Sequence, residues 1–171
     1  SGEIDLADNT GNQMMHHTQS GSWMGAGICS GDVNGDGYDD IVIGADGRNE
    51  VYVYFGITNA GGIKSEQEAD VTLKPTGGNG LGDSIGVGDV DGDGIEDIVI
   101  GNRGGSSYTG ETYLFYGRQN WGSATYSSPD VSFLGENGYS SSCYFGDNVW
   151  VADVDNDKYM DIIVTEPYYY E

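Results

Sequence analysis

The fold is decided by a segment that occurs three times along the chain. Residues 31–44 read GDVNGDGYDDIVIG, residues 88–101 read GDVDGDGIEDIVIG, and residues 152–165 read ADVDNDKYMDIIVT. The copies align without gaps, and a bulky residue followed by glycine precedes each one at the same spacing: Met24-Gly25, Leu81-Gly82 and Phe145-Gly146. The chain therefore contains an internal repeat of about 60 residues, which is typical of repeat architectures.

Each copy is flanked by segments of strand length and strand composition. The apolar triplets 41–43, 98–100 and 162–164 are β-branched on both faces, as in a strand buried between two sheets. The other expected strands lie at 85–87, 149–151, 50–55, 111–116 and, more weakly, at 70–73 and 130–134. Four short strands per repeat, joined by glycine-rich turns, predict an all-β fold of β-propeller blades, each with four antiparallel strands.

The repeats organise the chain, residues 1–171, as a single propeller region. They are expected at roughly 19–79, 80–142 and 143–171, which makes two full repeats plus half of a third. Residues 1–18 are expected to supply an outer strand, around Ile4 to Thr10, or a blade remnant. Because closure needs at least four blades, we expect a partial propeller. It is either a fragment of a longer propeller, which we favour, or a copy that assembles with others.

The composition restricts the function. The chain has 28 Asp and Glu against 6 Lys and Arg, a net charge of −22, which excludes nucleic-acid binding through phosphate contacts. No apolar run approaches the length of a membrane-spanning helix, so no membrane insertion is expected in this segment. The 25 Val and Ile against five Leu favour strands. Cys29 and Cys143 carry no metal or redox spacing, and they fit a bridge or two free thiols.

The acidic stretch of each copy predicts a Ca²⁺ site. Oxygen side chains recur at positions 1, 3, 5 and 9, and position 7 can add its backbone carbonyl. Such a set of hard oxygen donors, without His or Cys, selects Ca²⁺ over Zn²⁺ or Cu²⁺. The expected ligands are Asp32, Asn34, Asp36, Tyr38 and Asp40 in the first loop, Asp89, Asp91, Asp93, Ile95 and Asp97 in the second, and Asp153, Asp155, Asp157, Tyr159 and Asp161 in the third.

Two other interpretations of these loops fail. A simple Asp/Gly turn needs one Asp or Asn, not three or four at fixed spacing. An EF-hand needs a bidentate Glu at position 12, which here is Ile43, Ile100 or Val164. The third loop departs from the other two at position 6, where Lys158 replaces a glycine, so a left-handed backbone there would cost about 1 kcal/mol. Its ammonium would also lie beside the cation.

The repeated residues resemble the FG-GAP repeats of integrin α-subunits. That family's pattern runs from Phe-Gly through a strand, D-x-D-x-D-G-x-x-D and a second strand to Gly-Ala-Pro. Phe145-Gly146 matches its opening, and Gly44-Ala45 and Glu166-Pro167 match part of its close. The resemblance implies a propeller with Ca²⁺ in the loop between strands 1 and 2 of each blade, and ligands on the opposite face. The expected ligand-facing residues are Asn79, Arg103, Tyr108, Asn137, Tyr139 and Tyr168 to Tyr170.

The function we expect is that of a non-catalytic, calcium-binding module of an extracellular or cell-surface protein. It would mediate adhesion or assembly by binding a protein or glycan, or the remaining blades of the same or a neighbouring chain. One alternative is the accessory region of a secreted enzyme, either a lipase or a carbohydrate-active enzyme. Another is a calcium-dependent lectin, with Trp121 or Tyr139 stacking on sugar rings. No catalytic constellation is evident, because the paired carboxylates lie inside the metal loops.

Overall fold

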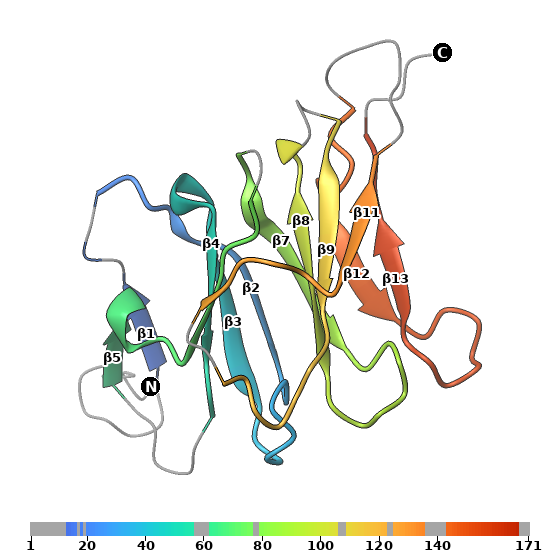
Figure 1. Ribbon diagram of the computed structural model, residues 1–171, viewed down its shortest axis with the longest axis horizontal. Coiled ribbons are helices and arrows are strands. Elements are labelled where there is room, and N and C mark those ends of the chain that lie inside the picture. Colours follow the sequence, from blue (N-terminus) through green and yellow to red (C-terminus); the bar gives the residue numbers. More distant parts are fainter. Residues whose placement is uncertain are drawn as a thin grey trace, which may run out of the picture.

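The computed structural model describes residues 13–16, 18, 20–56, 62–76, 79–105, 109–122, 125–135 and 143–167. It contains two blades of four antiparallel strands and a third unit of two strands (Figure 1). The first blade consists of β2 (Met24–Gly31), β3 (Asp40–Ala45), β4 (Glu50–Tyr54) and β6 (Val71–Leu73). The second consists of β7 (Leu81–Gly88), β8 (Asp97–Asn102), β9 (Glu111–Phe115) and β11 (Val131–Leu134), and the third unit of β12 (Val149–Ala152) and β13 (Asp161–Val164). The predicted fold class is confirmed.

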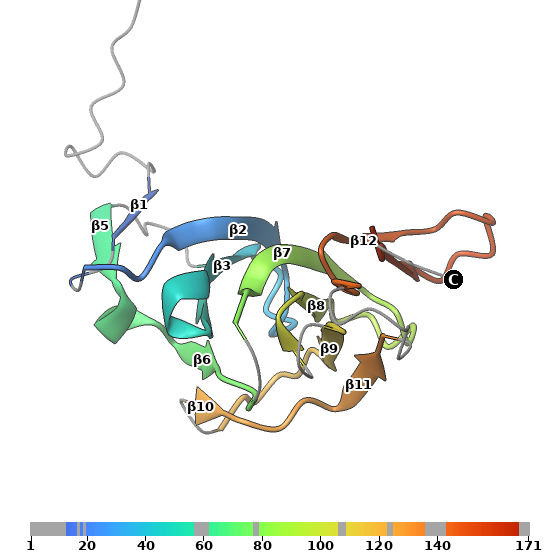
Figure 2. The same cartoon turned by 90° about the horizontal axis from the view of Figure 1, so that it is seen from above.

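The structure contains two strand pairings that the sequence repeat does not predict. Strand β1 (Gln13–His16) pairs in parallel with β5 (Gly62–Ser65) beside the first blade. Strand β10 (Thr125–Tyr126), which belongs to the second repeat, pairs in parallel with β6 and extends the sheet of the first blade (Figure 2). The outer strand expected around Ile4 to Thr10 lies outside the described residues, and the repeat boundaries stay a prediction. Among the described residues, helix is limited to the 3₁₀ turns η1 (Asp46–Arg48) and η2 (Glu66–Glu68) and to Gly105.

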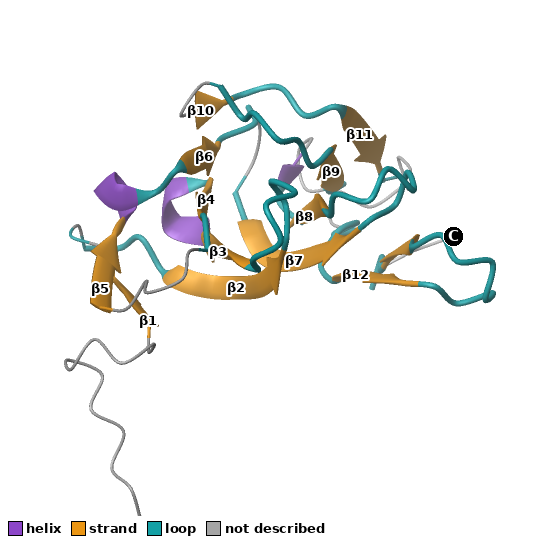
Figure 3. Ribbon diagram, turned by 90° about the horizontal axis from the view of Figure 1, so that it is seen from below, coloured by secondary structure: helices purple, strands orange, loops and turns teal. Residues whose placement is uncertain are grey.

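The blades bury both faces of their central strands. In β8, Ile98 and Ile100 face the first blade, in a core that includes Val42 and Phe115, whereas Val99 faces the other way and packs with Val149 of β12. This arrangement explains the unbroken apolar triplet of β8, because that strand has the first blade on one side and β12 on the other. Figure 3 shows the blades side by side, with β2, β7 and β12 in a row along one side.

Adjacent blades approach each other through paired glycines. A Cβ atom added at Gly44 of β3 would overlap the carbonyl oxygen of Gly82 in β7, and one added at Gly101 of β8 would overlap that of Gly146. Gly82 and Gly146 are the glycines that follow a bulky residue in each repeat. In the second and third repeats this glycine therefore marks where the start of the repeat contacts the preceding blade. Thr165 occupies the corresponding position of the third repeat.

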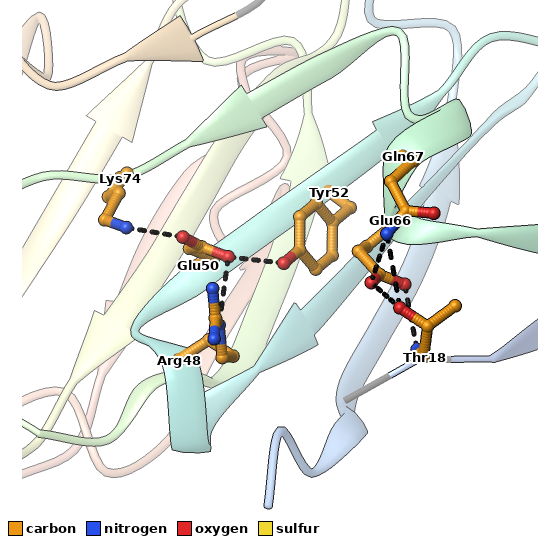
Figure 4. Close-up of polar contacts among 7 residues, drawn as sticks. All are labelled: Thr18, Arg48, Glu50, Tyr52, Glu66, Gln67 and Lys74. Atoms are coloured by element: carbon orange, nitrogen blue, oxygen red, sulfur yellow. Dashed lines mark hydrogen bonds and ion pairs between the residues drawn. The ribbon is translucent and has the colours of Figure 1, made fainter. Parts of the chain in front are cut away.

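A group of hydrogen bonds and ion pairs lies beside the strands of the first blade (Figure 4). The buried Glu50 of β4 accepts hydrogen bonds from the Tyr52 hydroxyl and from Lys74, and Arg48 lies 3.7 Å away. Burial acts to raise the pKa of Glu50, but Lys74 and Tyr52 outweigh it and hold that pKa below its ordinary value. Nearby, Glu66 of η2 accepts hydrogen bonds from Thr18 and Gln67, which connects η2 to the segment before β2.

Candidate metal centres

The three acidic loops lie at the same edge of the molecule. They connect β2 to β3, β7 to β8 and β12 to β13, and each is seen at the lower edge of Figure 1. Because the strands are antiparallel, the connections from β3 to β4 and from β8 to β9 lie at the opposite edge. The three acidic loops therefore lie together at one edge, and the connections between the second and third strands of each blade lie at the other.

The aspartate at position 1 organises each loop. Its carboxylate accepts the backbone N–H groups of positions 5 and 6: Asp32 accepts them from Asp36 at 3.0 Å and from Gly37 at 2.8 Å. The corresponding distances are 3.1 and 2.9 Å at Asp89 and 3.1 and 3.0 Å at Asp153. The three loops thus share one turn, although the third has lysine where the others have glycine.

The side chains at positions 3 and 5 turn into the same loop. The N–H of position 5 also donates to position 3, at 2.8 Å in the first loop and at 3.1 Å in the other two. Carboxylate oxygens of Asp89, Asp91 and Asp93 lie within 4.8 Å of one another, and so do those of Asp153, Asp155 and Asp161. In the first loop position 3 is an amide, and Asn34 Nδ2 donates to Asp36 at 3.1 Å.

The aspartate at position 9 is buried in the first two loops. Asp40 and Asp97 are 0% and 1% exposed, and each accepts the N–H of position 2 and that of a glycine after the third strand, Gly56 or Gly117. Burial raises the pKa of both carboxyl groups to about 6, although these backbone hydrogen bonds act to lower it. Position 9 therefore fastens the loop to its own blade, and its role as a metal ligand stays a prediction.

The donor set is that of a site for a hard cation. Every candidate side-chain ligand offers oxygen, and among the described residues none of the ion pairs involves a carboxylate at positions 1, 3, 5 or 9. Close carboxylates without a counter-charge repel one another. The residues present thus fit a divalent ion. The carbonyl ligands expected at position 7, from Tyr38, Ile95 and Tyr159, stay a prediction.

A cavity of about 780 Å³ lies at the opposite edge. Its lining includes Asn79 and Arg103, two of the expected ligand-facing residues, together with Trp23 and Tyr144. Arg103 pairs with Asp83 at 2.7 Å. Trp23 and Tyr144 have the left-handed φ values of 49° and 56°, and Trp23 is 69% exposed. Backbone strain of this kind gathers at functional sites.

Trp23 and Tyr144 are not among the expected ligand-facing residues, although each directly precedes the bulky residue and glycine that open a repeat. The other expected ligand-facing residues, Tyr108, Asn137, Tyr139 and Tyr168 to Tyr170, lie outside the described residues. The expectation that Trp121 is an exposed sugar platform is wrong. It is 4% exposed, and its indole N–H donates to the Val33 carbonyl at 3.0 Å.

A family profile described as FG-GAP-like repeat matches residues 32–100 and again residues 89–164. The chain belongs to this family. The FG-GAP match covers the acidic loops of all three repeats together with the strands between them, so the resemblance deduced from the motif is confirmed. Repeats of this family are β-propeller blades, in agreement with the two blades described above.

Longer curated proteins carry similar FG-GAP sequences. Integrin alpha-4 of Xenopus laevis is 27% identical over 150 residues, which cover 84% of this chain and 14% of that protein. Phosphatidylinositol-glycan-specific phospholipase D is 31% identical over 171 residues in Dictyostelium discoideum and 28% over 163 in Homo sapiens. These matches cover 86% and 85% of this chain, and 18% and 19% of those proteins. The chain thus spans less than a fifth of the length of these relatives.

Two smaller expectations can also be compared with the structure. Cys29 and Cys143 form no disulfide with each other, which decides between the two alternatives left open by their spacing. In the described part of the chain, no helix has the length and apolar character needed to cross a membrane.

Proposed function

We propose that the FG-GAP region is a non-catalytic, calcium-binding propeller module of an extracellular or cell-surface protein. It mediates adhesion or assembly by binding a protein or a glycan. The observation that carries the proposal is the set of three equivalent loops at one edge, each with its carboxylates turned inward by the same backbone hydrogen bonds. A turn on a solvated face has no need of such an arrangement.

Calcium is the ion that suits these loops best. All side-chain donors are oxygens, and the loops connect strands rather than the helices of an EF-hand. Three bound Ca²⁺ would add six positive charges to a chain with a net charge of −22. Extracellular calcium is in the millimolar range, where even weak sites of 10⁻⁴ to 10⁻³ M are filled. Relatives such as integrin alpha-4 support an extracellular location.

The ligand site of the module is the cavity opposite the metal edge. Trp23 offers an exposed aromatic face, while Arg103 and Asn79 offer hydrogen-bond donors beside it. Aromatic and arginine side chains are frequent anchors in binding interfaces. The metal loops then have a structural role, because they stiffen the edge away from the ligand.

A second candidate function is the accessory region of a secreted enzyme. The similarity to phosphatidylinositol-glycan-specific phospholipase D favours it, since that protein is an enzyme by name and this chain matches only a small part of it. In this case the module still has no reaction of its own. Assaying the 171-residue chain for phospholipase activity, beside any longer natural form of the protein, separates the two: activity confined to a longer form supports the accessory role.

The calcium proposal is tested by titration and melting. Isothermal titration of metal-free protein with CaCl₂ should give up to three sites, with MgCl₂ as the control ion. Melting in millimolar Ca²⁺ and in EDTA should differ, because a ligand bound only to the folded state adds about 2.7 kcal/mol per site at 100 times its Kd. An unchanged melt together with no binding heat would remove the proposal.

The ligand proposal needs its own measurement. A glycan array and a panel of immobilised extracellular proteins should be probed with the wild-type chain and with Trp23→Ala. Binding that is lost in Trp23→Ala, while the melt in Ca²⁺ stays unchanged, supports the cavity as the ligand site. Binding that is unaffected by the substitution places the ligand elsewhere.

A further inference from the structure

Neighbouring acidic loops contact each other directly, and always in the same direction. The N–H of position 8 donates to the carbonyl of position 1 in the preceding loop: Glu96 to Asp32 at 3.0 Å, and Met160 to Asp89 at 3.4 Å. The residue at position 7 packs over position 4 of the preceding loop. A Cβ atom at Gly35 would lie 3.1 Å from the Ile95 side chain. The loops therefore form a series, in which the second loop contacts the first and the third contacts the second.

Glu96 makes the first of these junctions different from the second. Its carboxylate accepts the backbone N–H of Asp32, with 2.8 Å between the nitrogen and Oε2. Gly31 leaves the necessary space, because a Cβ atom there would overlap the Glu96 carboxylate. Glu96 thus holds Asp32 through both its backbone N–H and its carbonyl. At the second junction Met160 occupies position 8, and its thioether side chain lacks a carboxylate to accept the N–H of Asp89.

Asp32 is the residue on which the first loop is built. Its carboxylate accepts the N–H groups of Asp36 and Gly37, so the orientation of its backbone sets the direction of the first ligand. Glu96 itself lies between position 7 and the buried Asp97 of the second loop. Any ordering of the second loop therefore restrains the backbone of Asp32, through the hydrogen bonds that its N–H and its carbonyl make with Glu96.

We propose that Glu96 is a positioning residue through which Ca²⁺ binding in the second loop raises the Ca²⁺ affinity of the first. This inference rests on the proposed calcium binding. Since coupling between two sites is reciprocal, Ca²⁺ in the first loop strengthens the second loop by the same factor. The third loop contacts the second through Met160 and Tyr159 without a carboxylate, so its coupling to the second loop is weaker.

The test is a site-resolved calcium titration of the 171-residue chain by ¹⁵N NMR. The amides of Gly37 and Gly94 report the first and second loops, since each donates to the position 1 carboxylate of its own loop. Asp93→Ala removes a ligand of the second loop, and we expect it to weaken binding at Gly37 by about fivefold or more, the lower end of common coupling strengths. In the Glu96→Ala background, where only the backbone hydrogen bond from residue 96 to Asp32 remains, the same substitution should weaken binding at Gly37 much less.

Three further variants control this experiment. Asp39→Ala removes the exposed carboxylate at position 8 of the first loop, so it reproduces the loss of charge near that loop without touching the junction. Glu96→Gln keeps the acceptor oxygen, and it should keep most of the coupling. Met160→Glu introduces an acceptor at the second junction, and it should make the affinity reported by Gly94 depend on Asp157.

The outcomes separate this inference from the function on which it rests. If neither Gly37 nor Gly94 responds to Ca²⁺, calcium binding itself is refuted. If both respond but Asp93→Ala leaves the Gly37 titration unchanged in a wild-type background, the coupling is refuted. If Glu96→Ala fails to fold, Glu96→Gln and Met160→Glu still decide the matter, because one must retain the coupling and the other must create it.

Discussion

The second and third repeats carry the same acidic motif but differ wherever the next blade would contact them. The first two repeats have glycine at three contact positions, and the third repeat has a side chain at each. The pairs of glycines are Gly31 and Gly88, Gly35 and Gly92, and Gly44 and Gly101, and their counterparts are Ala152, Asn156 and Thr165. In the described chain the outer face of β12 and β13 exposes Trp150 and Ile163. Glycine at these positions therefore follows contact with a succeeding blade, not the presence of the acidic motif.

At position 6, by contrast, the three loops have the same backbone conformation although their residues differ. Its φ is 88° at Gly37, 89° at Gly94 and 81° at Lys158, so the loop imposes a left-handed backbone whatever the residue. The hydrogen bonds to the position 1 carboxylate are present in all three loops, and they hold Lys158 in a conformation that it would otherwise avoid. The acidic motif thus determines the backbone of the loop, whereas the neighbouring blade determines where glycine is needed.

The largest effect is expected where one blade backbone touches the next. Gly101→Ala should destabilise the fold by about 3 kcal/mol, because its Cβ atom would overlap the Gly146 carbonyl and neither backbone can move easily. The matched substitution Thr165→Ala should cost only about 1 kcal/mol, for its hydrogen bonds to Asn148. Urea unfolding in Ca²⁺ measures both. Equal costs would mean that the glycines do not mark the blade contacts.

A smaller effect is expected from removing one calcium ligand. Asp89→Ala and Asp153→Ala should each abolish one site and the stabilisation it supplies, about 2.7 kcal/mol at 100 times Kd. Asp89→Ala should cost more, because its loop contacts both neighbours, whereas the third loop contacts only the second in the described chain. The difference in melting temperature between Ca²⁺ and EDTA is the measurement. A larger loss in Asp153→Ala would reverse the comparison.

The smallest effect is expected from exchanging the residues at position 6. Gly94→Lys should destabilise the second loop by about 1 to 2 kcal/mol, because it imposes a left-handed backbone on a side chain. Lys158→Gly should change the stability by less, since the strain it relieves is offset by the greater freedom of glycine in the unfolded chain. It should instead tighten Ca²⁺ binding at the third loop. Titration of both variants with CaCl₂ would show whether position 6 affects affinity or only folding.

Much of the fold followed from the repeat alone. The order of strands, the four-stranded blades and the position of each acidic loop between the first two strands all agree with the structure. A repeat fixes these features because equivalent residues meet equivalent surroundings, and the periodicity of apolar residues then identifies the strands. The oxygen side chains at positions 1, 3 and 5, which the spacing predicts as ligands of one ion, accept backbone hydrogen bonds within each loop, and their role as ligands stays a prediction.

The features that the sequence did not predict depend on contacts between repeats. Trp121 is predicted to be exposed, but it is buried in the core that the two blades share, where its indole N–H donates to the Val33 carbonyl of the first loop. The pairing of β10 with β6 crosses from one repeat to the other, and two residues are too short for a strand signal. The sequence does not distinguish Glu96 from the other acids of its loop, although its carboxylate accepts the backbone N–H of Asp32 in the preceding loop.

The sequence by itself determined the family, the blade and the residues that surround each candidate calcium site. These depend on local spacing, and spacing is preserved in the chain whatever its surroundings. Only the tertiary structure decided that the loops form a directional series, that Arg103, Trp23 and Tyr144 share a cavity, and that Gly44 and Gly101 are points of backbone contact. The physical reason is that such relations join residues of different repeats, whose distance is set by how two blades pack.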